Sequence, residues 1–153
     1  MPRILFVSHC PSENTSELRD SALDAIGSLD LDDIEVVSKD PLDAGAADVE
    51  SCDGILIGTT ENFGSMAGLI KDFFERVYYP CLASKQGLPV GLYIRAGEDG
   101  RGTRTNVTKI ITGLRWKLIA EPLVLRGSYK QEFNEQVAEL AMTMAAGLDA
   151  EIF

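Results

Sequence analysis

The sequence predicts an α/β protein, a three-layer sandwich in which a five-stranded parallel sheet carries helices on both faces. Short apolar runs, most of them rich in Val and Ile, alternate along the chain with amphipathic stretches. Most of these runs are nearly continuous rather than alternating, which is typical of strands that are covered on both faces. Right-handed crossovers between parallel strands then place helices on both sides of the sheet.

The expected strands are the apolar runs at 3–8, 34–38, 54–60, 89–94 and 118–125. The expected helices lie between them. A first helix follows Asn14, which we predict as its N-cap because Glu17 three residues later completes a capping-box pattern. Residues 66–78 carry apolar side chains at spacings of three and four, which predicts a helix against the sheet. Further helices are expected at 103–117 and 131–147, with only a brief or irregular one within 40–52.

The length of 153 residues suits a single domain spanning 1–153. The beginning of the chain has too short an apolar run for a signal peptide or a membrane span. The three cysteines Cys10, Cys52 and Cys81 are far apart and lack the spacing of a zinc or iron–sulfur site, so we expect no metal. These features favour a reduced, cytoplasmic setting without membrane contact.

The net charge is −10, from 24 acidic and 14 basic residues. A nucleic-acid-binding protein needs a dense basic face to replace the counterions of the phosphates, so this balance argues against nucleic acid as a partner. An acidic exterior can keep the protein soluble, or it can steer the chain toward a basic protein partner.

Ligands of open parallel sheets bind beyond the carboxyl ends of the strands, where the strand order reverses. The loops to consider are therefore 8–15, 59–65 and 95–102. The first runs straight into a helix, and a helix N-terminus attracts phosphate even without a lysine or arginine. The alternative is a helix that is merely well capped. The chain contains neither the G-x-G-x-x-G pattern nor a Walker loop.

The second loop and the helix after it resemble the flavodoxin-like NAD(P)H-dependent FMN and quinone reductases, whose segment commonly reads GTPVYFGSMSG followed by spaced Lys, Phe and Arg. The matching residues are Gly58, Thr59, Phe63, Gly64, Ser65, Met66, Gly68, Lys71, Phe73 or Phe74, and Arg76. The first loop resembles the phosphate loop of that family at Ser8, Asn14, Thr15 and Leu18. The resemblance covers nearly the whole chain and is most specific in 54–77.

The resemblance implies FMN as the cofactor, with its phosphate in the 8–15 loop and its isoalloxazine ring along 59–64. Backbone groups there and at 95–97 would bond the polar edge of the ring. The expected cofactor-binding residues are Ser8, Ser12, Asn14, Thr15, Thr59, Thr60, Glu61, Asn62, Phe63, Gly64, Arg95, Ala96 and Gly97. The chain departs from the family pattern at Glu13, Thr60 and Asn62, which replace a glycine, a proline and an aromatic residue.

The activity implied by the resemblance is hydride transfer from NAD(P)H through FMN to a quinone, a flavin or a similar small acceptor. Arg95 can stabilise negative charge on the reduced ring, and Arg101 or Arg104 can meet the phosphates of the nicotinamide co-substrate. The alternative is a solvated loop in which Glu98 and Asp99 neutralise these arginines. No side chain need act as a catalytic acid or base, because the cofactor supplies the chemistry. Related reductases often form their site between subunits, which implies a homo-oligomer.

Two alternatives remain open. A flavodoxin-type electron-transfer protein would serve protein partners instead of oxidising NAD(P)H, which suits the small size and the acidic charge. A flavin-less interaction protein of the same fold would explain the departures at Glu13, Thr60 and Asn62.

Overall fold

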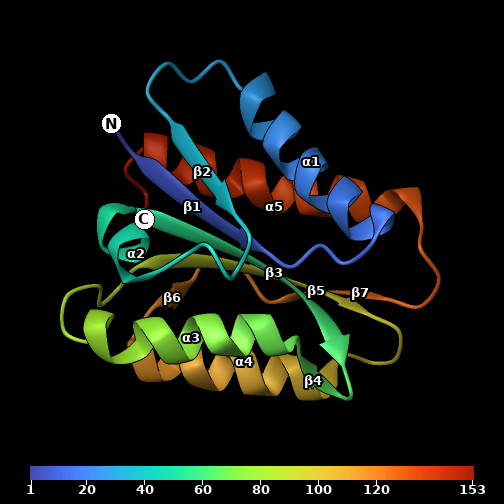
Figure 1. The fold of residues 1–153 in the computed structure, drawn as a ribbon. Helices are drawn as coiled ribbons and strands as arrows, with labels where there is room; N and C mark the ends of the chain where they lie inside the picture. The colour runs from blue at the N-terminus through green and yellow to red at the C-terminus, as the bar shows by residue number, and fades with distance from the viewer.

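The protein folds as a central sheet between two layers of helices (Figure 1). The computed structural model describes residues 1–153. Helices α1 (Glu13–Ser28) and α5 (Gln131–Asp149) cover one face of the sheet, whereas α3 (Gly68–Cys81) and α4 (Arg101–Leu114) cover the other. The short helix α2 (Ala46–Ser51) packs beside α3. The predicted three-layer α/β class is therefore confirmed. No helix combines the length and the apolar character needed to cross a membrane.

The parallel strands lie in the order β2-β1-β3-β5, formed by β1 (Arg3–Ser8), β2 (Glu35–Lys39), β3 (Gly54–Asn62) and β5 (Pro89–Ala96). The strands β6 (Lys117–Leu118) and β7 (Leu123–Arg126) pair in parallel with the beginning and the end of β5. The two-residue strand β4 (Ser65–Met66) folds back antiparallel on β3. The chain passes from β1 to β2 on one side and then to β3 on the other, so the order reverses between β1 and β3.

Two of the five predicted strands, the third and the last, differ from the prediction. The expected strand at 118–125 is interrupted, because Pro122 has no N–H to give to a ladder and the chain bends between β6 and β7. The expected strand at 54–60 continues to Asn62 and turns into β4, which the sequence analysis did not predict.

The first helix begins earlier than predicted, and its N-cap is Ser12 rather than Asn14. The Ser12 side chain accepts a hydrogen bond from the N–H of Thr15, and the Thr15 hydroxyl accepts one from the N–H of Ser12. This reciprocal pair replaces the predicted pairing with Glu17, and Asn14 lies in the first turn. The helix expected at 103–117 ends at Leu114, because Arg115 adopts a left-handed conformation with φ of 60°.

The core lies on both faces of the sheet, which explains the continuous apolar runs. Ile4 and Phe6 of β1 belong to the cluster under α1 and α5, whereas Leu5 and Val7 belong to the cluster under α3 and α4. Trp116 is buried after α4, and its ring centre lies 6.3 Å from that of Phe74 in α3, so it packs the end of α4 against α3.

Gly58 in β3 lies under the ring of Tyr93 from the neighbouring strand, so a Cβ at this position would collide with the Tyr93 ring and hydroxyl. We predict that Gly58→Ala lowers the free energy of unfolding by about 1–3 kcal/mol through overpacking. Gly27→Ala is the matched control, because nothing lies within 4 Å of its Cβ position in α1. It should raise stability by roughly 0.5–1 kcal/mol. Urea unfolding of both variants tests this, and equal stabilities for the two would contradict it.

Candidate functional site

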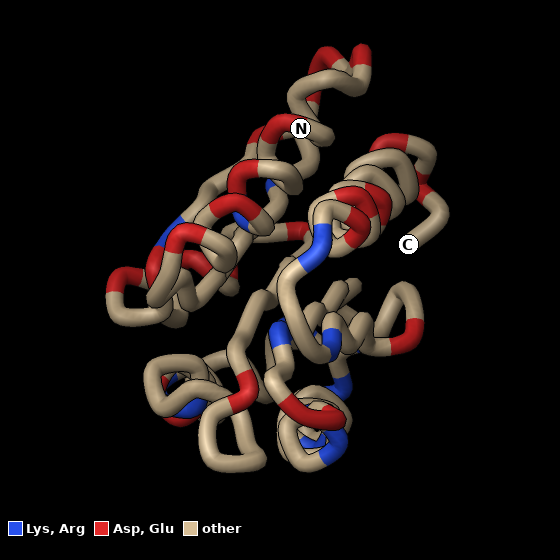
Figure 2. Tube along the Cα trace, turned by 90° about the vertical axis from the view of Figure 1, so that its right-hand side faces the viewer, with Lys and Arg blue, Asp and Glu red and all other residues tan.

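The predicted loops meet at the carboxyl edge of the sheet, the edge that faces the viewer in Figure 2. The register aligns Ser8 of β1 with Gly58 of β3, and Thr60 of β3 with Arg95 of β5. A fourth loop, 126–130, follows β7 at the same edge. This edge includes the place where the strand order reverses, which is the usual ligand position of such sheets.

The most exposed feature of this edge is the turn between β3 and β4. Phe63 and Gly64 both have positive φ, 52° and 72°, as in the tight hairpin turns that suit the twist of the sheet. The left-handed conformation is strained for a bulky residue such as Phe63. The Phe63 side chain is also fully exposed, so packing does not explain it. A strained and exposed aromatic residue at the edge where such sheets usually bind ligands makes Phe63 a candidate for contact with a ligand.

The hairpin is held to the β5–α4 loop by the carboxylate of Glu61. Its Oε1 accepts a hydrogen bond of 3.0 Å from the N–H of Glu98, and its Oε2 accepts one of 2.8 Å from the N–H of Gly100. Gly100 is the N-cap of α4, so the carboxylate also meets the positive end of that helix dipole. Glu61 therefore acts as a clip between two of the predicted loops.

Two further contacts join the same hairpin to α4. The amide of Asn106 donates a 2.8 Å hydrogen bond to the hydroxyl of Ser65. Gly102 approaches the carbonyl of Gly64 so closely that no Cβ would fit between them. Together with the Glu61 clip, these contacts make the hairpin and the first turns of α4 one rigid unit.

The hydroxyls of the two threonines near the end of β3 form hydrogen bonds with other groups of the protein. Thr59 is buried, and its Oγ1 accepts a 3.1 Å hydrogen bond from the N–H of Ala67, just before α3. The Thr60 hydroxyl donates a 2.9 Å bond to Oδ1 of the exposed Asn62. These two hydroxyls therefore shape the loop instead of projecting from it.

Arg95 is similarly engaged. Its Nη1 donates hydrogen bonds of 3.0 Å to the carbonyls of Ala96 and Leu125, and the guanidinium lies 5.0 Å from the ring centre of Phe133. It thus ties the end of β5 to β7 and α5. Ala96 is buried, whereas Gly97 is exposed and has open space where a side chain would stand. The backbone at Gly97 is therefore open to a flat ligand.

The sequence analysis missed the loop at 126–130, although its position after the last strand was a usable signal. The Tyr129 hydroxyl donates a 2.8 Å hydrogen bond to Glu17 of α1 and also meets the amide of the buried Asn134. Desolvation and the Glu17 carboxylate raise the pKa of Tyr129, so the phenol stays protonated and keeps donating at neutral pH. This contact holds the beginning of α5 against the N-terminal part of α1.

The hydroxyls predicted to hold a phosphate are already partnered. Ser12 and Thr15 cap α1 through each other, and the Thr15 hydroxyl also donates a 2.9 Å bond to the Ser12 carbonyl. Ser8 is buried, and its Oγ lies 3.6 Å from Cys10 Sγ. Only Asn14, of the four predicted residues, is exposed without a partner for its side chain.

The hollow in front of this loop has a volume of about 510 Å³ and is acidic. Its lining includes Glu13, Glu17 and Asp20 and no lysine or arginine. The adjacent Arg19 donates a 3.0 Å bond to Asp20. A dianionic phosphate therefore fits this end of the site poorly, whereas the hairpin end offers an exposed aromatic ring and open backbone.

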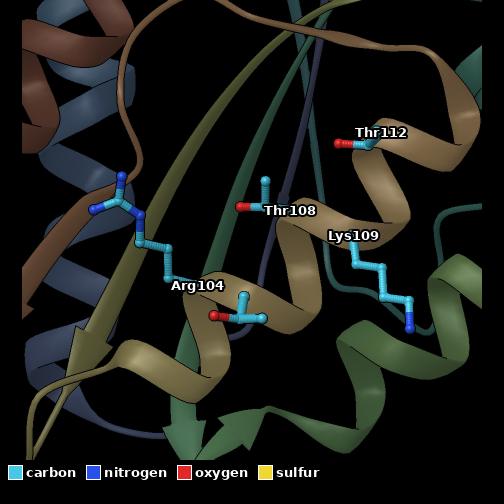
Figure 3. Close-up of a pocket in the computed structure, with 5 residues that line it drawn as sticks. Arg104, Thr108, Lys109 and Thr112 are labelled. Atoms are coloured by element: carbon cyan, nitrogen blue, oxygen red, sulfur yellow. The ribbon is translucent and has the colours of Figure 1, made fainter.

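A hollow of about 490 Å³ on the outer face of α4 holds the cations that the first loop lacks (Figure 3). Arg104 and Lys109 line it together with Thr105, Thr108 and Thr112. The two cationic side chains point away from each other, and Arg104 approaches Glu121 at 3.4 Å. They do not converge on one position, so this hollow is not the flavin site that the resemblance implies.

The thiols are not arranged for chemistry. Burial raises the pKa of Cys52 and of Cys81 to about 11, so both are protonated at neutral pH. The half-buried Cys10 lies with its Sγ 3.5 Å from the carbonyl of Thr15. No group of three or more His, Cys, Asp or Glu side chains is placed to hold a metal ion.

Comparison with known proteins identifies a family model and solved structures that the chain resembles. The family model described as NADPH-dependent FMN reductase matches residues 15–121. No curated protein matches the chain. A flavodoxin from the domain Archaea has 14% identity and a TM-score of 0.79, with 95% of this chain and 98% of that chain covered.

Flavodoxin 1 from Bacillus cereus has 16% identity and a TM-score of 0.75, with 94% and 97% of the two chains covered. The rubredoxin oxygen:oxidoreductase from Desulfovibrio gigas has 13% identity and a TM-score of 0.76, with 99% of this chain but 37% of that chain covered. At such identities the likeness establishes the fold, which is flavodoxin-like, as the sequence resemblance implied.

We predict that Glu61→Gln weakens the clip, because the glutamine amide keeps one acceptor and turns an N–H toward another N–H. The free energy of unfolding should fall by about 1–3 kcal/mol. The amides of Glu98 and Gly100 should also exchange with solvent faster, which hydrogen exchange followed by NMR measures. Glu98→Gln is the control, since it removes the same charge from an exposed carboxylate in the same loop. Unchanged exchange in Glu61→Gln would show that the clip is not formed in solution.

Proposed function

The chain belongs to the NADPH-dependent FMN reductase family, and from this premise we propose that it is an oxidoreductase that transfers hydride from NAD(P)H through a bound flavin to a small acceptor. Quinones and free flavins are the acceptor classes that we expect. FMN is the flavin that the family description names. A homo-oligomer and a cytoplasmic location stay predictions.

The observation that carries this proposal is the hairpin with Phe63 at its tip. The turn presents a strained, fully exposed aromatic ring at the carboxyl edge of the sheet, and Glu61 at its base is bonded to the loop that carries the open backbone of Gly97. Few other ligands suit such a place as well as a flat, conjugated ring, which gains from aromatic contact and from backbone hydrogen bonds at its edge. The rigid support of the hairpin favours a preformed site.

Within this proposal, the residues of the chain bind and orient. Phe63 offers its ring to one face or edge of the flavin, and the N–H and C=O groups of the 59–64 and 95–97 segments bond its polar edge. Glu61 fixes the distance between those two segments through its bonds to Glu98 and Gly100. Arg95 positions the end of β5 by donating hydrogen bonds to the carbonyls of Ala96 and Leu125. A bound flavin supplies the hydride chemistry itself, so we assign no catalytic acid or base.

We predict that Phe63→Ala raises the dissociation constant for a flavin roughly 5- to 10-fold, because an aromatic contact of about 1 kcal/mol and its buried area are lost. Tyr79→Ala is the matched control, since Tyr79 is an exposed aromatic residue on α3, away from the hairpin. Quenching of flavin fluorescence during titration measures both. Equal flavin affinity in Phe63→Ala and the wild type would show that Phe63 does not contact the flavin.

An electron carrier of the flavodoxin type is the second candidate, and the distribution of charge favours it. Acidic residues lie along α1 and α5, whereas basic residues gather around α4, which belongs to the opposite helix layer (Figure 2). Residues 101–117 contain Arg101, Arg104, Lys109, Arg115 and Lys117 and no Asp or Glu. Such an asymmetric surface can orient a protein partner.

Steady-state oxidation of NADPH and NADH, followed by absorbance with a quinone or a flavin as acceptor, separates the two candidates. The reductase is expected to oxidise at least one nicotinamide substrate well above the rate of the same mixture without protein. If the flavin-loaded protein leaves both nicotinamides unoxidised yet accepts electrons from a separate reductase, the carrier is the better description.

A further inference from the structure

The two ends of the proposed flavin site differ in their chemistry, and this difference selects the ligand. We propose that the chain recognises a flavin by its ring system and not by a terminal phosphate, so that riboflavin binds at least as tightly as FMN. This proposal rests on the proposed flavin function and specifies the ligand class of that same site. It departs from the phosphate loop that the resemblance implied.

The donors of the 8–15 loop are largely used within the protein. The Ser12 hydroxyl accepts from the N–H of Thr15 at 3.3 Å, and the Thr15 hydroxyl accepts from the N–H of Ser12 at 3.0 Å. A phosphate that took these groups would break the cap of α1, which stabilises the first turn of that helix. What remains for a phosphate is the N–H groups of Cys10, Glu13 and Asn14, the Asn14 amide and the O–H of the buried Ser8.

The charges around those remaining donors repel an anion. Glu13 is the first residue of α1, and Glu17 and Asp20 line the same hollow of about 510 Å³. The N-terminus of a helix attracts an anion, but the Glu13 carboxylate already lies in that first turn. A phosphate monoester carries a charge of about −1.5 to −2 at neutral pH, so each carboxylate raises the cost of its binding.

No lysine or arginine pairs with Glu13 or Glu17. Arg19 is the nearest arginine along the chain, and its guanidinium donates to Asp20, so the charges of this pair offset each other and the repulsion comes from Glu13 and Glu17. Glu17 accepts a hydrogen bond from the uncharged hydroxyl of Tyr129, which does not offset the charge of the carboxylate. The basic residues Arg104 and Lys109 belong to the hollow on the outer face of α4. The phosphate end therefore favours an uncharged ribityl chain.

Contacts between the β3–β4 hairpin and the flavin ring do not depend on whether the ribityl chain carries a phosphate. Phe63, Gly64 and Gly97 offer an aromatic face and accessible backbone there, and Glu61 uses its carboxylate on the neighbouring loop. Riboflavin and FMN share the ring that this end would bind. The difference between their affinities thus reports on the 8–15 loop alone.

The test is a pair of titrations of the wild-type protein, one with riboflavin and one with FMN, followed by flavin fluorescence at low salt. We expect the dissociation constant for FMN to equal that for riboflavin or to exceed it by up to roughly tenfold, with the gap narrowing in about 0.5 M salt as the repulsion is screened. FMN binding measurably tighter than riboflavin, in the same buffer and beyond the error of the two titrations, would overturn the proposal.

Variants of α1 locate the effect. Glu13→Gln should tighten FMN binding roughly threefold and leave riboflavin unchanged, because only the phosphate senses that charge. Asp24→Asn is the matched control, since Asp24 is an exposed carboxylate on α1 outside the hollow. Equal effects of Glu13→Gln on both flavins would contradict the proposal. If neither flavin binds at about 1 mM, the proposed flavin function itself fails, an outcome distinct from a reversed preference.

Discussion

The candidate site depends on the carboxylate of Glu61, whose two hydrogen bonds join the β3–β4 hairpin to the N-terminus of α4. The hairpin is an extension beyond the sheet, and such an element would otherwise move independently of its neighbours. Charge-assisted bonds to backbone N–H groups at a helix N-terminus are among the stronger polar contacts of proteins. The Asn106–Ser65 bond and the Gly102–Gly64 approach support the same join. The strained tip at Phe63 is tolerated because its base is held on several sides.

The family resemblance implied that one flavin contacts both the hairpin and the N-terminus of α1, but these two parts of the candidate site differ in chemistry. The hairpin end presents an aromatic ring and open backbone, which suit the flat part of a flavin. The α1 end satisfies its own N-terminus through Ser12 and Thr15 and surrounds it with carboxylates. One end is thus prepared for a ligand, and the other is prepared for a stable helix. In our proposal, the chain keeps the architecture of its family but binds the flavin through the ring more than through the phosphate.

Much of the fold could be predicted from the local sequence, because strands that are buried on both faces consist of nearly continuous apolar residues. The alternation of Ile4 and Phe6 with Leu5 and Val7 across the two core clusters bears this out. The split of the last strand was also readable, since Pro122 stands in the middle of the apolar run. The choice between Ser12 and Asn14 as N-cap was not, because both residues begin a plausible capping pattern.

The contacts that define the site were beyond the reach of the sequence. Glu61 meets partners 37 and 39 residues away, and Tyr129 meets Glu17 across 112 residues. Nothing in the local sequence distinguishes a clipped carboxylate from a ligand-binding one. The positions of the loops were predictable from strand order, whereas the use of each side chain depended on its neighbours in space.

Mapping of amide chemical shifts during a riboflavin titration of the labelled protein tests the central claim most directly. The account predicts saturable shifts in 60–64 and 95–100, on the two sides of the Glu61 clip, and little change in 105–112 on the outer face of α4. Shifts centred on 105–112, or none at all at a concentration where the flavin is soluble, would contradict it.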